Sequence, residues 1–140
     1  MTRFFFPLVI LTLQLLFTSL SQQDDSNYFL EPADVHVINR LPSQLKIHCR
    51  SKGNDLGERA LNKDQEFSWK FKTNIFGTTL YWCNFTWGAK FTSFDVFNKT
   101  VKPGCQDTIG IKMHCYWEVR SDGFYFSGNN KDYQRACGWP

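Results

Sequence analysis

The chain has 140 residues, a formal net charge of +3, an aromatic content of 17% and five cysteines. A charge this small does not indicate nucleic acid or an anionic membrane as the main partner. The length suits one domain with one core, and the many large rings supply apolar area for that core. We therefore expect a single folded unit and ask in which compartment its cysteines act.

The first 21 residues have the layout of a secretory signal peptide. Arg3 precedes the apolar run 4–17, and the small residues Ser19 and Ser21 follow it. A membrane anchor is the alternative, but the run is shorter than the roughly 20 apolar residues that cross a bilayer. We expect cleavage after Ser21, no membrane insertion of the remaining chain, and a secreted, extracellular protein.

Residues 22–33 are acidic and irregular, and we expect a short leader there, before a domain over 34–140. Alternation of apolar and polar residues with a period of two predicts the strands of this domain. They are 34–41, 44–50, 66–72, 81–87, 91–97, 109–120 and 124–126, the last two joined by a tight turn at Asp122-Gly123. Short strands broken by turn residues indicate an all-β fold, an antiparallel β-sandwich.

The stretch 51–65 interrupts this series. It contains Gly, Asn and Asp as turn formers and charges of alternating sign. Its acidic residues lack the regular spacing of a calcium loop. We expect a solvated turn over 51–65.

The cysteines are Cys49, Cys83, Cys105, Cys115 and Cys137. In an oxidising compartment, scattered thiols in a small domain are far more often bridged than catalytic or metal-bound. No Cys/His spacing of a zinc site is present in the sequence, so we expect no metal and no cofactor. The residues alone leave the pairing open. A Cys49–Cys83 bridge would close a loop of about 34 residues and contribute roughly 3 to 4 kcal/mol.

Two triplets, Asn84-Phe85-Thr86 and Asn98-Lys99-Thr100, are N-glycosylation acceptors. A glycan is bulky and hydrated, so a modified Asn84 must face solvent. Cys83, its neighbour in the same strand, then faces the core with the apolar rings of that strand. This placement favours a disulfide over a reactive thiol at Cys83.

Several blocks together resemble the plant self-incompatibility S-protein homologue family. In chain order they are VHVINRLP at 35–42, LKIHCRSK, NDLG, FSWKFK, GTTLYWCNFTW, FDVF and CYWEVRSDGFYF. The resemblance implies a β-sandwich held by two disulfides among Cys49, Cys83, Cys105 and Cys115, with Cys137 left unpaired. It also implies a secreted, non-enzymatic ligand that a cell-surface receptor reads through its loops, in pollen–pistil recognition.

Three stretches are the best candidates for the partner-facing surface. They are 51–65, 99–108 and Ser127–Arg135, which join or follow strands and carry mixed charge. Loops of this kind often bind partners, because a rigid scaffold positions them.

Two other classes of function deserve comparison. Secreted ribonucleases use histidines as general acid and base, but neither His36, His48 nor His114 is followed by their His-Gly-Leu-Trp block. Outward histidines on strands are usually solvated imidazoles, so we expect no catalytic residue and no enzyme. The alternative is a secreted carbohydrate-binding or defence-related β-protein, with Trp82, Tyr116 and Tyr125 as a stacking platform.

Overall fold

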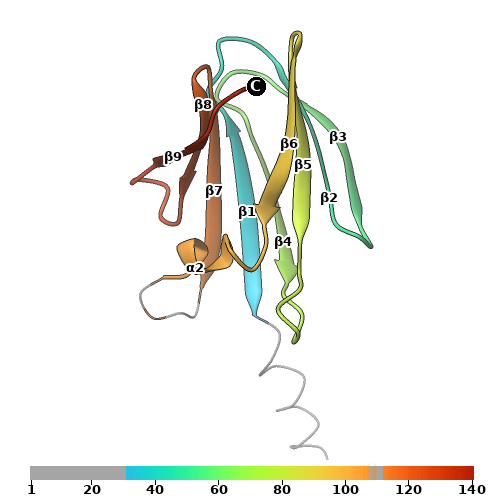
Figure 1. Cartoon of the computed structure of the whole chain (residues 1–140), viewed down its shortest axis with the longest axis vertical. Coiled ribbons are helices and arrows are strands. Elements are labelled where there is room, and N and C mark those ends of the chain that lie inside the picture. The colour runs from blue at the N-terminus through green and yellow to red at the C-terminus, as the bar shows by residue number, and fades with distance from the viewer. Residues whose placement is uncertain (1–30, 108, 110–111) are drawn as a thin grey trace, which may run out of the picture. The chain divides into compact units, whose positions relative to one another are not determined.

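The computed structural model describes residues 31–107, 109 and 112–140. The expected signal peptide 1–21 and all but the end of the expected leader lie outside these residues. Figure 1 shows two β-sheets that face each other. The strand order is β4-β1-β7-β8-β9 in one sheet and β3-β2-β5-β6 in the other. The all-β sandwich predicted from the alternating pattern is confirmed.

The five-stranded sheet combines strands from both ends of the described chain. Its members, in sheet order, are β4 (Glu66–Lys72), β1 (Pro32–Asn39), β7 (Met113–Arg120), β8 (Gly123–Ser127) and β9 (Gln134–Cys137). Its neighbouring strands are antiparallel except β1 and β7, which run parallel. The chain between β1 and β7 forms β4, α2 and the whole four-stranded sheet, so a long crossover joins this parallel pair.

The four-stranded sheet is antiparallel throughout. Its members, in sheet order, are β3 (Asp55–Leu61), β2 (Leu45–Arg50), β5 (Tyr81–Trp87) and β6 (Lys90–Phe97). A single helical turn, α2 (Lys102–Cys105), connects β6 toward β7.

The expectation of a solvated turn over the whole of 51–65 is wrong, because β3 occupies its middle. β3 is an edge strand with mostly exposed side chains, so it lacks the clear alternation of a half-buried strand. Its pairing with β2 contains a bulge between the pairs His48–Glu58 and Arg50–Asp55. Gly57 lies in that bulge with φ +81°, a conformation that glycine adopts without strain.

Other strand boundaries also differ from the sequence prediction. β1 begins at Pro32, so the last two residues of the expected leader belong to the sheet. β7 begins at Met113 rather than Ile109, and residues 110 and 111 of the expected strand lie outside the described residues. Met113 forms an antiparallel bridge with Gln106, and Asp107 N donates to Lys112 O at 3.1 Å. β9 was not predicted, since it is a short edge strand with mostly exposed side chains.

Aromatic side chains from both sheets fill the space between them. Phe94 is central to this core: its ring centroid lies 4.9 Å from Phe85, 4.8 Å from Phe124 and 5.1 Å from Trp117. These contacts join β6 to β5 in one sheet and to β8 and β7 in the other. Burying each such ring contributes roughly 2 to 3 kcal/mol, so the ring contacts are a major link between the sheets.

Two disulfides complete the core. Cys49 and Cys83 are direct partners on β2 and β5, with Cα atoms 4.0 Å apart, and their bridge joins them within one sheet. Cys105 and Cys115 join α2 to β7. All four are at most 1% exposed. Cys137 is unpaired and half-buried on β9, where burial raises the pKa of its thiol.

Candidate functional site

Three connecting segments meet at one end of the sandwich, which we call the loop end. They are the β2–β3 turn 51–54, the β4–β5 loop 73–80 and the segment 98–107 that contains α2. In Figure 1 this end points toward the bottom of the view. The strand registers agree, because Lys72 lies opposite Pro32 at the start of β1 and Tyr81 lies opposite Phe97 at the end of β6.

The β4–β5 loop is organised by the side chain of Asn74. Its Oδ1 accepts from Thr78 N at 2.9 Å, and its Nδ2 donates to Thr78 Oγ1 at 2.8 Å. The backbone N of Asn74 donates to Thr79 Oγ1 at 2.8 Å. Gly77 N donates to Asn74 O at 3.3 Å, and Gly77 has φ +67°. The turn is therefore held by hydrogen bonds and by a glycine that accepts a left-handed backbone.

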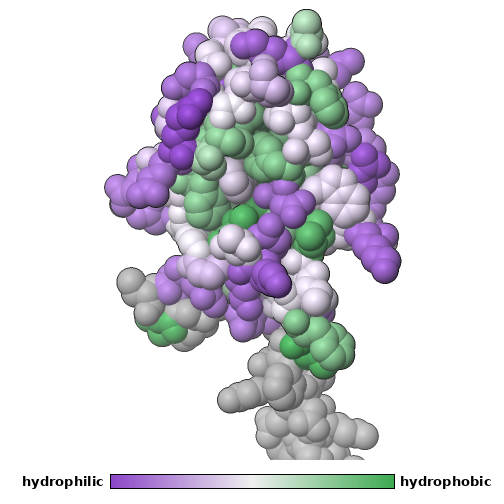
Figure 2. All heavy atoms as spheres, in the orientation of Figure 1, coloured by the Kyte–Doolittle hydropathy of each residue, from purple (hydrophilic) through white to green (hydrophobic). Residues whose placement is uncertain are grey.

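This turn carries two large apolar side chains into solvent. Ile75 is 58% exposed and Phe76 is 79% exposed. Leu80 in the same loop and Ile109 beyond α2 are also exposed. Of the large hydrophobic residues that the structure describes as exposed, only Phe91 lies elsewhere. Figure 2 shows apolar atoms projecting at this end of the molecule.

Open depressions flank the β4–β5 loop on two sides. One, of about 540 Å³, separates the loop from the β2–β3 turn and is lined by Lys52 and Lys72 among others. The second, of about 360 Å³, lies between the loop and the start of segment 98–107, with Lys99 and Asp95 in its lining. The loop end thus combines an apolar tip with surrounding basic side chains.

Residues 73–80 were not among the stretches that we expected to face a partner. A signal was available, because TNIFGTTL places two large apolar residues directly before a glycine and among residues that hydrogen-bond to turns. That signal is weak, because large apolar residues such as Ile75 and Phe76 are more often buried in the core than exposed in a turn.

The structure separates the three stretches that the sequence favoured. Within 51–65, only the turn 51–54 lies at the loop end, since β3 carries 62–65 to the opposite end. The stretch 99–108 lies at the loop end as far as it is described, and contains α2. Ser127–Arg135 connects β8 to β9 along the edge of the five-stranded sheet and enters β9 at Gln134.

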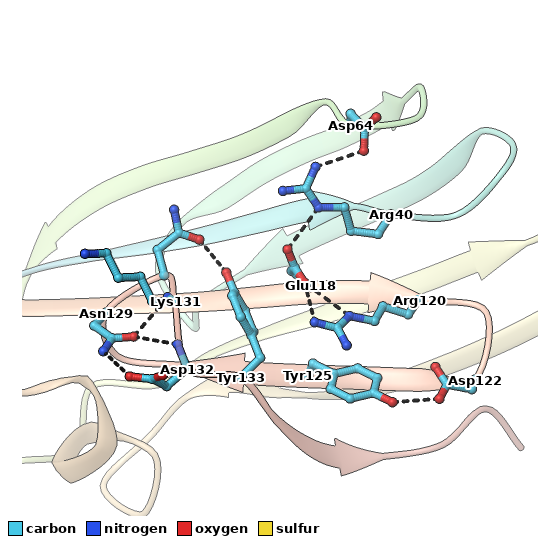
Figure 3. A network of polar contacts seen from close by, with 11 residues as sticks. Arg40, Asp64, Glu118, Arg120, Asp122, Tyr125, Asn129, Lys131, Asp132 and Tyr133 are labelled. Atoms are coloured by element: carbon cyan, nitrogen blue, oxygen red, sulfur yellow. Dashed lines mark hydrogen bonds and ion pairs between the residues drawn. The ribbon is translucent and has the colours of Figure 1, made fainter.

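A polar network fixes Ser127–Arg135 and the neighbouring sheet face (Figure 3). Asn129 Oδ1 accepts from the backbone N of Lys131 and of Asp132, each at 2.9 Å. Tyr133 donates to Asn130, and burial raises the pKa of Tyr133 to about 12. This segment is built as a rigid turn rather than an adaptable loop.

Glu118 is the centre of the second part of this network. Its carboxylate is only 10% exposed and accepts from Arg40 Nε at 2.9 Å and from Arg120 Nη2 at 2.7 Å. The hydrogen bond to Glu118 raises the pKa of the Arg40 guanidinium. Arg120 also lies over the ring of Tyr125, 3.8 Å from its centroid. These contacts satisfy a nearly buried charge, so their role is structural.

The three candidate platform rings do not share a surface. Trp82 lies on the outer face of the four-stranded sheet, with the Arg50 guanidinium 5.8 Å from its ring centroid. Tyr116 and Tyr125 lie on the outer face of the other sheet, where His36 stacks on Tyr116 at 4.5 Å and Arg120 covers Tyr125. This arrangement offers no common stacking platform for a sugar.

Two of the three histidines converge on one carboxylate. His36 on β1 and His114 on β7 both contact Asp34 on the outer face of the five-stranded sheet. His48 lies on the outer face of the other sheet and pairs with Asp55. From the sequence we expected outward histidines to be solvated imidazoles; His36 and His114 do lie on an outer face, but each also contacts Asp34.

The two predicted glycosylation sites have different surroundings. Asn84 lies at the middle of β5, on the outer face, where its Oδ1 accepts from Ser93 Oγ at 2.8 Å. Asn98 follows β6; its Oδ1 accepts from Thr100 N and Val101 N, and its Nδ2 donates to Asp95 at 3.1 Å. Both side chains are half-buried, and glycosylation at either stays a prediction.

A family model described as plant self-incompatibility protein S1 matches residues 34–139. The chain belongs to this family. The match covers both sheets from β1 to β9, so it includes the loop end and the two disulfides.

Several curated relatives are S-protein homologs of Arabidopsis thaliana. S-protein homolog 29 is 38% identical, over 75% of this chain and 76% of its own length. S-protein homolog 2 is 32% identical, over 87% of this chain and 86% of its own length. S-protein homolog 5 is 39% identical over a shorter stretch, 56% of this chain and 57% of its own length.

A solved structure has the same fold. It is described as a self-incompatibility protein homologue from a widespread family of small, highly stable, secreted proteins from plants. The TM-score is 0.59 at 24% identity, and the match covers 79% of this chain and 96% of the other. The expectation of a secreted protein agrees with that description. Among residues 31–107, 109 and 112–140, no helix is long and apolar enough to cross a membrane.

Proposed function

We propose that this protein is a secreted plant recognition ligand that presents its loop end to a cell-surface receptor protein. Membership of the self-incompatibility S1 family supports a role in recognition, and pollen–pistil recognition is the process that the family name suggests. The receptor contacts the β4–β5 loop first, and the flanking depressions receive the rim of the receptor's binding surface.

The observation that carries this proposal is the outward placement of Ile75 and Phe76. These two exposed side chains do not pack in the core. Hydrogen bonds among Asn74, Thr78 and Thr79 nevertheless hold the turn that exposes them. A loop already fixed in its bound conformation loses little conformational entropy on binding. Large apolar side chains that become buried at the centre of an interface contribute most of its binding energy.

The charges at the loop end define the complementary surface. Lys52, Lys72 and Lys99 surround the apolar tip. The receptor therefore offers an apolar socket with an acidic rim. Such rim charges accelerate association more than they strengthen the complex, and salt weakens them.

The test is affinity capture on plant cell surfaces with the mature, oxidised protein, followed by binding measurements on the captured receptor. The variant Ile75→Ser/Phe76→Ser should lower affinity about 10- to 100-fold, as expected for loss of central apolar contacts. The matched control is Phe91→Ser, which removes an exposed aromatic ring (55% exposed) from the outer face of β6. Phe91→Ser should bind normally.

Thermal melts of both variants should match the wild type, because the substituted side chains lie largely in solvent. If Phe91→Ser weakens binding as much as the double variant, the receptor reads the sheet face instead. If neither variant changes binding, the loop end is not the contact surface.

A further inference from the structure

The outer face of the five-stranded sheet carries a compact group of metal-ligand side chains, which we call the His–Asp cluster: Asp34, His36 and His114. β1 and β7 pair in parallel with Asp34 directly opposite His114. His36 follows Asp34 by two residues and therefore points to the same face. The cluster is thus fixed by the register of two central strands rather than by mobile loops.

The ligand atoms are close together. His114 Nδ1 lies 2.7 Å from Asp34 Oδ2 and 2.8 Å from Oδ1, and His36 Nε2 lies 2.8 Å from Oδ1. One ligand atom from each of the three residues lies within 4.8 Å of the others. Bonds of about 2.0 to 2.2 Å to a tetrahedral ion would separate the ligand atoms by about 3.3 Å. Small side-chain rotations would bring the cluster to that spacing.

Neighbouring side chains hold the His36 ring in the orientation that a metal ligand needs. Its Nδ1 lies 2.6 Å from Glu66 Oε1, and its ring stacks on Tyr116 at 4.5 Å with an interplanar angle of 16°. Metal-binding histidines usually donate their second N–H to a carboxylate in this way. With an ion on Nε2, the neutral ring keeps its Nδ1–H for Glu66.

We propose that Asp34, His36 and His114 bind a divalent transition-metal ion of the zinc type. Two imidazole nitrogens and one carboxylate suit Zn²⁺ and its late first-row neighbours, whereas Ca²⁺ and Mg²⁺ require oxygen ligands. Three protein ligands leave a fourth position for water or for a ligand from another molecule. His114 is 41% exposed, so this position faces solvent.

The cluster is open to solvent, and neighbouring lysine side chains limit its affinity for a cation. An open depression of about 260 Å³ reaches Asp34 and His114 and is also lined by Lys70 and Lys112. Lys70 lies opposite Asp34 on β4. Its positive charge opposes the ion, while the carboxylates of Asp34 and Glu66 attract it.

The experiment is titration calorimetry with Zn²⁺ alone on the untagged, oxidised protein in a Cys137→Ser background, which removes the free thiol as a competing ligand. One ion should bind per chain. His114→Gln should abolish binding. Glu66→Gln should weaken it about 10- to 100-fold, because the carboxylate that accepts from His36 Nδ1 is lost. The matched control is His48→Gln, because His48 pairs with the single carboxylate of Asp55 at 2.6 Å and should leave binding unchanged.

A second readout keeps the result independent of folding defects. Saturating Zn²⁺ should raise the thermal midpoint of the Cys137→Ser protein and of its His48→Gln variant, but not that of His114→Gln. Imidazole nitrogen shifts in NMR spectra should change at His36 and His114 only. Absence of one-to-one binding, binding that survives His114→Gln, or binding that is lost with His48→Gln overturns the proposal. The outcome does not depend on the receptor.

Discussion

The two ends of the sandwich use the same side chain for opposite purposes. At the closed end, formed by the turns 40–44 and 62–65, Asn39 is fully buried. Its Nδ2 donates to Ser43 O at 3.0 Å and Leu61 O at 2.9 Å, and its Oδ1 accepts from Leu41 N at 2.9 Å. At the loop end, Asn74 organises its own turn by similar hydrogen bonds but stays exposed.

The two turns differ in whether the apolar residues beside the asparagine are buried or exposed. Asn39 closes a turn whose Leu41 is buried completely, so its hydrogen bonds help to cover the core. Asn74 shapes a turn whose Ile75 and Phe76 extend into solvent. Apolar exposure adds nothing to folding stability, so a turn fixed in this way supports the proposed role in binding.

The largest expected effect separates the two disulfides. The chain-entropy estimate gives about 4 kcal/mol for Cys49–Cys83, which spans 34 residues, and about 3 kcal/mol for Cys105–Cys115, which spans 10. Urea unfolding of the paired Ala variants should reproduce this order in the free energy of unfolding. Hydrogen exchange should rise selectively around α2 when Cys105–Cys115 is removed. The reverse order would mean that the bridge from α2 to β7 stabilises the fold more than the bridge within the four-stranded sheet does.

The alternating pattern predicted the parts of the fold with one buried face. Leu45, Ile47 and Cys49 all lie in the core as expected, because a one-residue shift would expose all three. The edge strands β3 and β9 were missed, since they bury few side chains and leave little pattern to read.

The His–Asp cluster was harder to predict because it depends on contacts distant in sequence. His114 and Asp34 are 80 residues apart and meet only through the parallel pairing of β1 with β7. Nothing local in the sequence specifies that pair. The outward direction of Phe76 has a local cause instead, the backbone of a single turn, and the general tendency of large apolar residues to be buried points the other way.

Asn39 and Asn74 should contribute in opposite proportions to folding and to receptor binding. Asn39→Ala removes three hydrogen bonds, two of them buried, and leaves their backbone partners without Asn39, so it should lower the free energy of unfolding by about 3 kcal/mol. Asn74→Ala should lower it by only about 1 kcal/mol, because water can replace the exposed contacts. Receptor binding should show the opposite order. Asn74→Ala should bind the receptor more weakly than the wild type, whereas the folded fraction of Asn39→Ala should bind with unchanged affinity. Equal binding by both variants would contradict a preorganised loop.

The smallest effects concern the predicted glycans. Thr86→Ala and Thr100→Ala each destroy one acceptor triplet without altering its asparagine, so the mass removed by an N-glycosidase should fall by one glycan in each. Stability should change by less than about 0.5 kcal/mol. Asn98→Gln should cost about 1 kcal/mol more than Thr100→Ala, since Asn98 Oδ1 also accepts from Thr100 N and Val101 N.

The two glycans should differ in their effect on binding because only one lies at the loop end. Asn98 lines the depression beside the β4–β5 loop, whereas Asn84 lies on the outer face of the four-stranded sheet. Thr100→Ala should therefore change the rate of receptor association, and Thr86→Ala should not. A change with Thr86→Ala alone would place the contact on the sheet face, the surface that Phe91→Ser probes, because a bulky glycan hinders only contacts within its reach.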